Sequence, residues 1–269
     1  MSISHPAAVP PPIPAGNHLL AAMTRAEREL VLRAATRVDL PAGTTLYAPG
    51  ERVGHVFLPE SGLVSLIADM EGEDGVEVGM VGREGLVGLG ALLGEPIVGV
   101  RVLVQVGGTA YRLEASAFAA LAEGSPNLRG LVRRHIAAML AHVARNAACN
   151  AAHPLERRTA RWLLSVADRV GPGLALTQDL VAIMLGARRP TVNQVLKGLR
   201  EAGLIRVARG QIAIADRAGL ERASCPCYAA QRALERRLLP GALGQGGSPE
   251  DEARPDAPAG RPGGTALGG

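Results

Sequence analysis

Cysteine is scarce in this chain of 269 residues, with one residue at each of positions 149, 225 and 227. An odd number of cysteines argues against a disulfide framework and suits a reducing compartment. Long apolar runs are also missing, because none reaches the roughly 18–20 residues that cross a bilayer. The first residues are rich in proline and lack the basic start and leucine-rich core of a signal peptide. We therefore expect a cytoplasmic protein that does not enter a membrane.

Motifs for catalysis are missing as well. The sequence shows no nucleophile–base motif, phosphate loop or metal-ligand cluster, so we predict that the chain is not an enzyme. Cys225 and Cys227 form a Cys-x-Cys pair, but as a zinc site this pair is two ligands short and has no histidine nearby in the sequence. We interpret both as small buried residues, with a redox or metal switch as the alternative, and predict no metal and no cofactor.

Charge is distributed unevenly along the chain. Residues 154–239 hold 15 Arg and Lys against 7 Asp and Glu, whereas residues 18–153 hold 12 against 14. The total of +4 therefore hides a basic module beside a mildly acidic one. A concentrated positive patch is typical of nucleic-acid binding.

Length and composition predict two folded domains between two tails. The tails, rich in glycine, proline and charge, are expected to be disordered. The predicted division is a tail at 1–17, a sensor domain at 18–124, a central helix at 125–153, a winged helix-turn-helix domain at 154–239 and a tail at 240–269.

The sequence of the sensor domain predicts a helix followed by short strands. Leu19 to Arg37 has a helical pattern, and strand-like runs separated by turn glycines follow at roughly ten-residue spacing, which favours a small β-roll or barrel. The predicted strands are Thr45–Tyr47, Val53–Leu58, Gly62–Ala68, Val76–Val81, Val100–Val106 and Thr109–Leu113. Such a roll could hold a ligand or act as a plain scaffold. The fold class expected for the whole chain is α+β.

A long alanine-rich helix is predicted over Leu128–Asn150, with apolar residues on too many faces for packing on one side only. We expect this helix to form the seam of a homodimer. His135, His142 and Cys149 recur every seven residues and share one stripe. At a dimer seam they could bind a metal or titrate near neutral pH, although partly solvated helix surface is the commoner role of such residues. A second helix is predicted over Leu155–Val170, with Trp162 in the core.

The segment from Thr177 to Ile214 predicts a helix pair followed by a two-stranded wing. Thr177 is a good N-cap, Gly186 suits a sharp turn, and Pro190 is tolerated in a first helical turn. The second helix has one apolar face, and its other face carries Arg189, Asn193, Gln194, Lys197 and Arg200. These side chains can donate to phosphates and base edges, so the helix suits a DNA major groove. The alternatives are a signal-binding module and a winged helix that contacts proteins and not DNA.

This order of elements resembles the Crp/Fnr family of bacterial transcription regulators. The resemblance covers residues 18–230 and rests on LPAGTTLYAPGE, VFLPESGLVSLI and, most specifically, LTQDLVAIMLGARRPTVNQVLKGLREAGLI. It implies a sequence-specific regulator that binds double-stranded DNA as a homodimer at a palindromic operator and contacts RNA polymerase. It also implies an N-terminal domain similar to cyclic-nucleotide-binding domains.

The resemblance assigns roles in the second helix. Arg189 matches the family's base-reading arginine, and Gln194 stands where the family often has arginine and would suit adenine. Pro190 replaces a common glutamate and cannot accept from a cytosine amine. The expected base-contacting positions are Arg189, Pro190, Asn193 and Gln194. The expected phosphate contacts are Thr177, Arg188, Thr191, Lys197 and Arg209.

The sensor domain departs from both well-known branches of the family. Gly88 matches the glycine of the cyclic AMP site, but Leu89 occupies the ribose-binding glutamate position and Gly99 the phosphate-binding arginine position. Because the chain has only three cysteines, and none precedes Cys149, a four-thiolate iron–sulfur cluster is excluded within one chain. The effector stays unidentified. The candidate effector pocket comprises Leu86, Gly88, Leu89, Leu92, Leu93 and Arg101.

Overall fold

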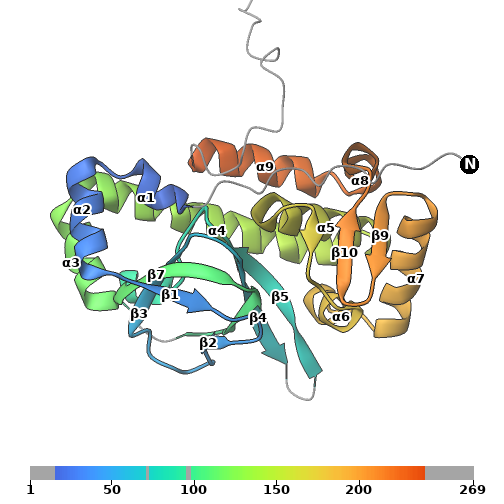
Figure 1. The fold of residues 1–269 in the computed structure, drawn as a ribbon, viewed down its shortest axis with the longest axis horizontal. Coiled ribbons are helices and arrows are strands. Elements are labelled where there is room, and N and C mark those ends of the chain that lie inside the picture. Colours follow the sequence, from blue (N-terminus) through green and yellow to red (C-terminus); the bar gives the residue numbers. More distant parts are fainter. Residues whose placement is uncertain (1–15, 71–72, 95–97, 240–269) are drawn as a thin grey trace, which may run out of the picture.

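The computed structural model describes residues 16–70, 73–94 and 98–239. The two predicted tails fall almost entirely outside these ranges. Two sheets, a long helix and a C-terminal three-stranded domain follow one another along the chain (Figure 1). No helix in the described ranges has the length and apolar character needed to span a membrane.

The N-terminal domain is a roll of two antiparallel sheets. The first has the order β1-β7-β3 and the second the order β2-β6-β4-β5. Their strands are β1 (Thr36–Leu40), β2 (Thr45–Tyr47), β3 (His55–Pro59), β4 (Leu63–Met70), β5 (Glu73–Val81), β6 (Arg101–Val106) and β7 (Gly108–Glu114). Inward side chains of both sheets join one core, in which Val56, Val104 and Phe118 are fully buried. The six strands predicted from glycine spacing are all present.

The first helical segment differs from the prediction. A single helix was expected from Leu19 to Arg37, but the structure has α1 (His18–Ala22), α2 (Arg25–Ala34) and then strand β1. Thr24 is the reason for the break, because its hydroxyl caps α2 and forms a reciprocal capping box with Glu27. Thr36 and Arg37 pair with β7 instead of extending the helix.

Helices connect the roll to the C-terminal domain. These are α3 (Ala115–Gly124) and the long helix α4 (Pro126–Ala152), whereas the short 3-10 helix η1 (Leu89–Leu92) lies within the roll between β5 and β6. Ser125 caps α4 by accepting from the amide of Leu128. One side of α4 packs on β5 and another on the C-terminal helix α9 (Cys227–Leu238), which lies along it in Figure 1.

The C-terminal domain is a winged helix. Its sheet has the order β8-β10-β9, and β8 is a strand that the sequence did not reveal. The elements are α5 (Leu155–Val170), β8 (Gly173–Leu174), α6 (Gln178–Leu185), α7 (Arg189–Glu201), β9 (Ile205–Ala208), β10 (Gln211–Ile214) and α8 (Arg217–Ala223), followed by α9. Its core extends into the roll, because Ile67 of β4 and Met80 of β5 pack in the same cluster as Trp162 of α5. The two domains therefore share a continuous apolar contact.

Candidate nucleic-acid interface and sensor cavity

The turn between α6 and α7 has the predicted geometry. The Thr177 hydroxyl accepts from the amide of Leu180 at 3.2 Å and begins α6, and Gly186 ends it in the left-handed region with φ of +56°. A Cβ atom on Gly186 would lie 2.9 Å from Cγ2 of Val76 in β5. Glycine is therefore needed both for the turn and for the close approach of the roll.

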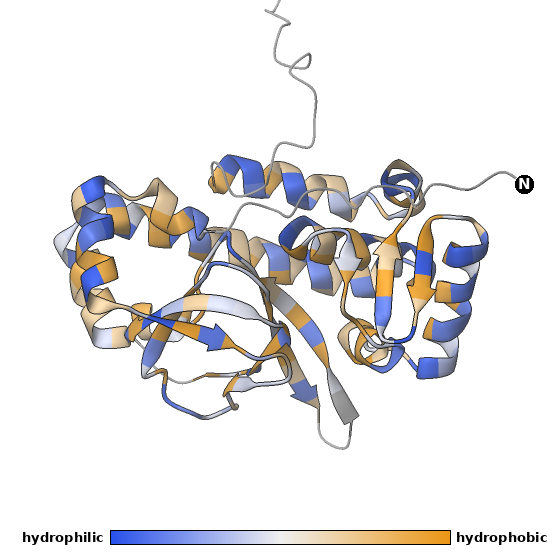
Figure 2. Cartoon of the chain, in the orientation of Figure 1, coloured by the Kyte–Doolittle hydropathy of each residue, from blue (hydrophilic) through white to orange (hydrophobic). Residues whose placement is uncertain are grey.

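Helix α7 has a buried apolar face and an exposed polar one. Val192, Val195, Leu196 and Leu199 are buried, as their spacing predicted. The helix lies at the outer edge of the domain, with hydrophilic segments recurring along it (Figure 2). Its exposed side chains, with Arg188 just before it, are Arg188, Arg189, Pro190, Thr191, Gln194, Lys197, Arg200 and Glu201. Asn193 differs from its neighbours because it is half-buried, and its Oδ1 finds no hydrogen-bond partner within the described residues.

Arg189 is held by a partner that sequence reasoning did not foresee. Its Nε lies 2.7 Å from Oδ1 of Asp179 in α6, and both side chains are more than half exposed. The sequence showed Asp179 only as an acidic residue in the first turn of α6. An exposed ion pair of this kind adds little stability, but in the structure it directs the guanidinium toward α6.

The wing adds two exposed cations beside α7. Gly210 makes the tight turn between β9 and β10 with φ of +69°, and Arg209 is exposed immediately before it. Arg206 is exposed on β9 and was not among the predicted contacts. Strand alternation was the missed signal, because Arg206 stands between the inward-facing Ile205 and Val207.

Family models match both domains of the chain. The model of the Crp-like helix-turn-helix domain matches residues 157–223, and that of the cyclic nucleotide-binding domain matches residues 37–125. The chain belongs to the Crp/Fnr family. It is thus a DNA-binding transcription regulator, and the predicted order of roll, central helix and winged helix is confirmed.

Solved structures of Crp/Fnr regulators share this fold. FixK2 of Bradyrhizobium japonicum aligns with a TM-score of 0.62 at 17% identity, over 71% of this chain and 98% of that one. The c-di-GMP-responsive regulator CLP of Xanthomonas campestris aligns with a TM-score of 0.59 at 19% identity, over 72% and 100%. A CRP/FNR-family regulator of Thermus thermophilus gives 0.57 at 24% identity, over 70% and 98%. A comparison with curated protein sequences found no match.

The roll of this Crp/Fnr chain contains an apolar cavity of about 160 Å³. Leu86, Gly88 and Leu89 of the predicted pocket line it, together with Gly99 and, from α4, Met139. Three predicted pocket residues do not line it, namely Leu92, Leu93 and Arg101. Among the described lining residues the only polar side-chain atom is the Tyr47 hydroxyl, which donates to the carbonyl of His55 at 2.7 Å.

Two of the predicted pocket residues that do not line the cavity lie elsewhere in the roll. Leu93 follows η1 and is 63% exposed. Arg101 stands at the start of β6, where its Nη2 lies 2.8 Å from Oδ1 of Asp69 in β4. Arg101 was included in the predicted effector pocket, but its guanidinium forms this ion pair and it does not line the cavity.

The stripe of His135, His142 and Cys149 does not face a dimer seam. All three side chains are buried inside the protomer. His135 contacts the backbone of Leu86, and His142 lies 3.6 Å from Glu235 of α9. Burial lowers the pKa of both histidines, so they stay neutral where free histidine would titrate. The expected partly solvated helix surface is therefore wrong for these residues, and the alternative of titration near neutral pH is not supported.

Two buried polar networks join the sensor domain to the DNA-binding domain. Glu77 of β5 accepts from Ser65 at 2.7 Å and from the indole of Trp162 at 2.9 Å. Burial raises the pKa of Glu77 to about 7, although both hydrogen bonds act against this shift. In the second network, Arg169 of α5 pairs with Glu84 at 2.7 Å and with Glu235 at 3.1 Å.

The Arg169 network places paired charges inside the contact between the two domains. Burial opposes ionisation of Glu235, but the positive charge of Arg169 and hydrogen bonds from His142 and Gln231 together outweigh it and lower the pKa of Glu235 to about 2. Removing one member of a buried pair leaves an uncompensated charge, which is strongly unfavourable. The relative placement of roll, α5 and α9 is therefore fixed by paired charges as well as by apolar contact.

Proposed function

We propose that the chain binds a palindromic DNA operator as a homodimer, with α7 of each protomer in the major groove. The observation that carries this proposal is the exposed polar face of α7, which stands at the edge of the domain beside the exposed wing arginines. A helix of this kind can enter the groove with its N-terminal residues toward the base edges. The net positive charge of residues 154–239 favours approach to the phosphate backbone.

Base reading is assigned to the first two turns of α7. Arg189 can donate two hydrogen bonds to guanine, and Gln194 can form a bidentate pair with adenine. Pro190 offers no acceptor to a cytosine amine, so the operator should differ from one read by a glutamate there. Asn193 takes part only if its half-buried side chain turns outward.

Phosphate contacts are assigned to the side chains around α7. Thr177 uses its hydroxyl oxygen to cap α6, which leaves the hydroxyl hydrogen free to donate. The remaining candidates are exposed and can donate to the DNA backbone, which positions a protein without reading sequence. They are Arg188, Thr191, Lys197 and Arg209, to which the structure adds Arg206.

The homodimer is assigned to the free side of α4. With β5 and α9 covering two sides of the helix, Leu140 remains 67% exposed. Ala137 and Ala144, one turn before and one turn after it, are exposed as well. Small residues around one large apolar side chain allow close helix approach across a two-fold axis. Contact with RNA polymerase and a cytoplasmic location follow from the family resemblance.

The sensor cavity is assigned to a small apolar effector and not to a cyclic nucleotide. Its volume is below the about 300–1,000 Å³ usual for larger ligands, and Leu89 and Gly99 supply no polar anchor there. A phosphate without a cation or an amide nest would be poorly neutralised.

Sequencing of genomic fragments captured by the purified full-length chain tests the DNA-binding proposal. We expect enrichment of an inverted repeat whose half-sites lie about one duplex turn, roughly 34 Å, apart. Fragments without an enriched inverted repeat, and without a gel shift even at low salt, would contradict the assignment of α7 to an operator.

A further inference from the structure

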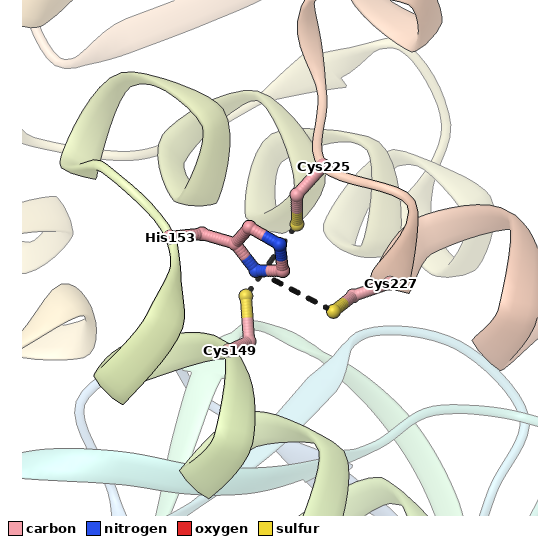
Figure 3. A group of neighbouring side chains, drawn as sticks. All are labelled: Cys149, His153, Cys225 and Cys227. Carbon is pink, nitrogen blue, oxygen red and sulfur yellow. Dashed lines mark hydrogen bonds between the residues drawn. The ribbon is translucent and has the colours of Figure 1, made fainter.

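Four potential metal ligands from two distant parts of the chain meet at the junction between the domains. Cys149 lies in the last turn of α4, and His153 directly follows that helix. Cys225 lies between α8 and α9, and Cys227 is the first residue of α9. Their side chains converge in Figure 3, and the three sulfur atoms and a ring nitrogen of His153 all lie within 4.8 Å of one another.

The spacing of these atoms suits a single tetrahedral ion. Zinc bonds of about 2.3 Å to sulfur and about 2.0–2.1 Å to nitrogen place tetrahedral ligand atoms roughly 3.5–3.8 Å apart. The Sγ atoms of Cys149 and Cys225 are 3.5 Å apart, and Sγ of Cys227 lies 3.7 Å from Nδ1 of His153. Both distances fall within or near this range without rearrangement of the backbone.

The local backbone holds each ligand pair in place. Cys149 and His153 are four residues apart, and the amide of His153 donates to the carbonyl of Cys149 at 3.0 Å, so both side chains lie on one face of the last helical turn. The amide of Tyr228 donates to the carbonyl of Cys225 at 3.1 Å, which fixes the short Cys-Pro-Cys segment.

The cysteines are not ordinary members of an apolar core. Cys149, Cys225 and Cys227 are buried, yet within the described residues they form a cluster of their own, separate from the large cores of both domains. Three thiolates and a neutral histidine around a divalent cation leave one net negative charge. The guanidinium of Arg158 lies within electrostatic range of Cys149 and Cys225. Its Nη1 donates a hydrogen bond to Oδ1 of Asn150 at 2.8 Å.

We propose that Cys149, His153, Cys225 and Cys227 bind one thiophilic divalent cation of the zinc class. A Cys₃His set with four converging ligands is typical of a closed structural zinc site. A disulfide would use two of the cysteines and leave the third cysteine and the histidine without a role. An iron–sulfur cluster would place its own atoms between the ligands and hold them further apart than a single ion does.

The bound cation would join the sensor side of the protein to the DNA-binding side. Cys149 and His153 stand at the end of the helix that packs on the roll, whereas Cys225 and Cys227 stand where the winged helix ends and α9 begins. Because 76 residues separate Cys149 from Cys225, the cation closes a large loop that contains the whole winged helix. Occupancy would therefore fix α9 on α4 and restrain the winged helix relative to the roll.

Cobalt titration of the reduced, metal-free, full-length protein tests the proposal. We expect binding of one Co²⁺ per chain, with thiolate-to-cobalt charge-transfer absorption and the intense visible bands of a tetrahedral ion, followed by displacement by Zn²⁺. The variant His153→Cys should keep one tetrahedral site with a changed spectrum, and Cys227→Ser should lose it. His55→Ala, a change at a half-exposed histidine of β3, should leave the titration unaltered.

Thermal unfolding gives a readout that does not depend on colour. Zinc should raise the unfolding temperature of the parent and of His55→Ala, but not that of Cys227→Ser. Reduced parent protein that binds no cobalt would overturn the proposal, whatever the variants do. So would bound iron together with inorganic sulfide, or a Cys149–Cys225 disulfide that forms in place of metal binding.

Discussion

Trp162 of α5 donates its indole N–H to the carboxyl group of Glu77 in β5 at a distance of 2.9 Å. This hydrogen bond links the first helix of the DNA-binding domain to a strand of the sensor domain. Both side chains are buried, and Met80 and Ile67 of the roll pack in the same cluster as Trp162. A change in the roll can therefore reach the DNA-binding domain through direct contact, without passing along α4.

Glu77 predicts a pH dependence of stability. Its pKa is raised from 4.5 to about 7 by burial, so between these values the folded chain holds a proton that the unfolded chain has lost. The free energy of unfolding should therefore fall as pH rises through this window, by an amount on the order of 3 kcal/mol. Urea unfolding at about pH 5 and about pH 7.5 measures the change.

Glu77→Gln isolates this effect because it keeps an acceptor for the indole but cannot ionise. The histidines His135 and His142, whose pKa values are lowered by burial, act in the opposite direction, because stability is lost as pH falls below their ordinary range. They are present in both proteins, so only the difference between the parent and the variant reports on Glu77. An identical pH slope in the two would contradict the assignment.

Leu140→Glu should convert the homodimer into a monomer. Leu140 is the most exposed large apolar residue of the described chain, and a carboxylate there would face its own copy across the two-fold axis. Light scattering at micromolar concentration should give twice the chain mass of 27.8 kDa for the parent and once that mass for the variant. Leu93→Glu, at an exposed leucine of the roll, is the matched control and should stay dimeric. A dimeric Leu140→Glu protein would place the seam elsewhere.

The roll should not bind cyclic AMP or cyclic GMP at physiological concentration. Each missing charge-assisted hydrogen bond, at Leu89 and at Gly99, should cost about 1.5–3 kcal/mol. Together these losses weaken binding by about two to four decades, which turns a micromolar site into a millimolar one or worse. Calorimetry with each nucleotide measures this directly. A micromolar dissociation constant would mean that Arg101 leaves Asp69 and reaches the phosphate.

Asp179→Asn should alter both the strength and the selectivity of DNA binding. The change removes a negative charge near the phosphates, so affinity for all sequences should rise at low salt. It also removes the carboxylate that lies 2.7 Å from Arg189, so discrimination at the base read by Arg189 should fall. Anisotropy titrations on matched and mismatched operators separate the two effects. If discrimination is unchanged, Asp179 does not orient Arg189.

The helix-turn-helix was predictable because its signals are local. Thr177, Gly186 and Gly210 mark a cap, a left-handed turn and a hairpin turn, and each does so in the structure. The break at Thr24 also has a local signal, the capping box with Glu27. The helical pattern continues on both sides of Thr24, so the prediction extended one helix through the break and into strand β1. Cap residues were thus more informative than periodicity at helix ends.

The polar clusters could not be predicted because the chain brings them together only on folding. A Cys-x-Cys pair at 225 and 227 looks two ligands short until α9 packs along α4 and places Cys149 and His153 beside it. Alternation identified β5 as a strand but could not pair Glu77 with Trp162, which is 85 residues away in the sequence.

The most direct test of DNA reading by α7 compares Arg189→Ala with Lys197→Ala on a set of operator variants over a range of salt concentrations. Arg189→Ala should weaken specific binding by about 1–3 kcal/mol and relax one base position in each half-site. Lys197→Ala should weaken binding to all sequences alike and reduce the salt slope by about one. If both variants lose affinity uniformly across the operators, or if neither does, α7 does not read DNA through Arg189.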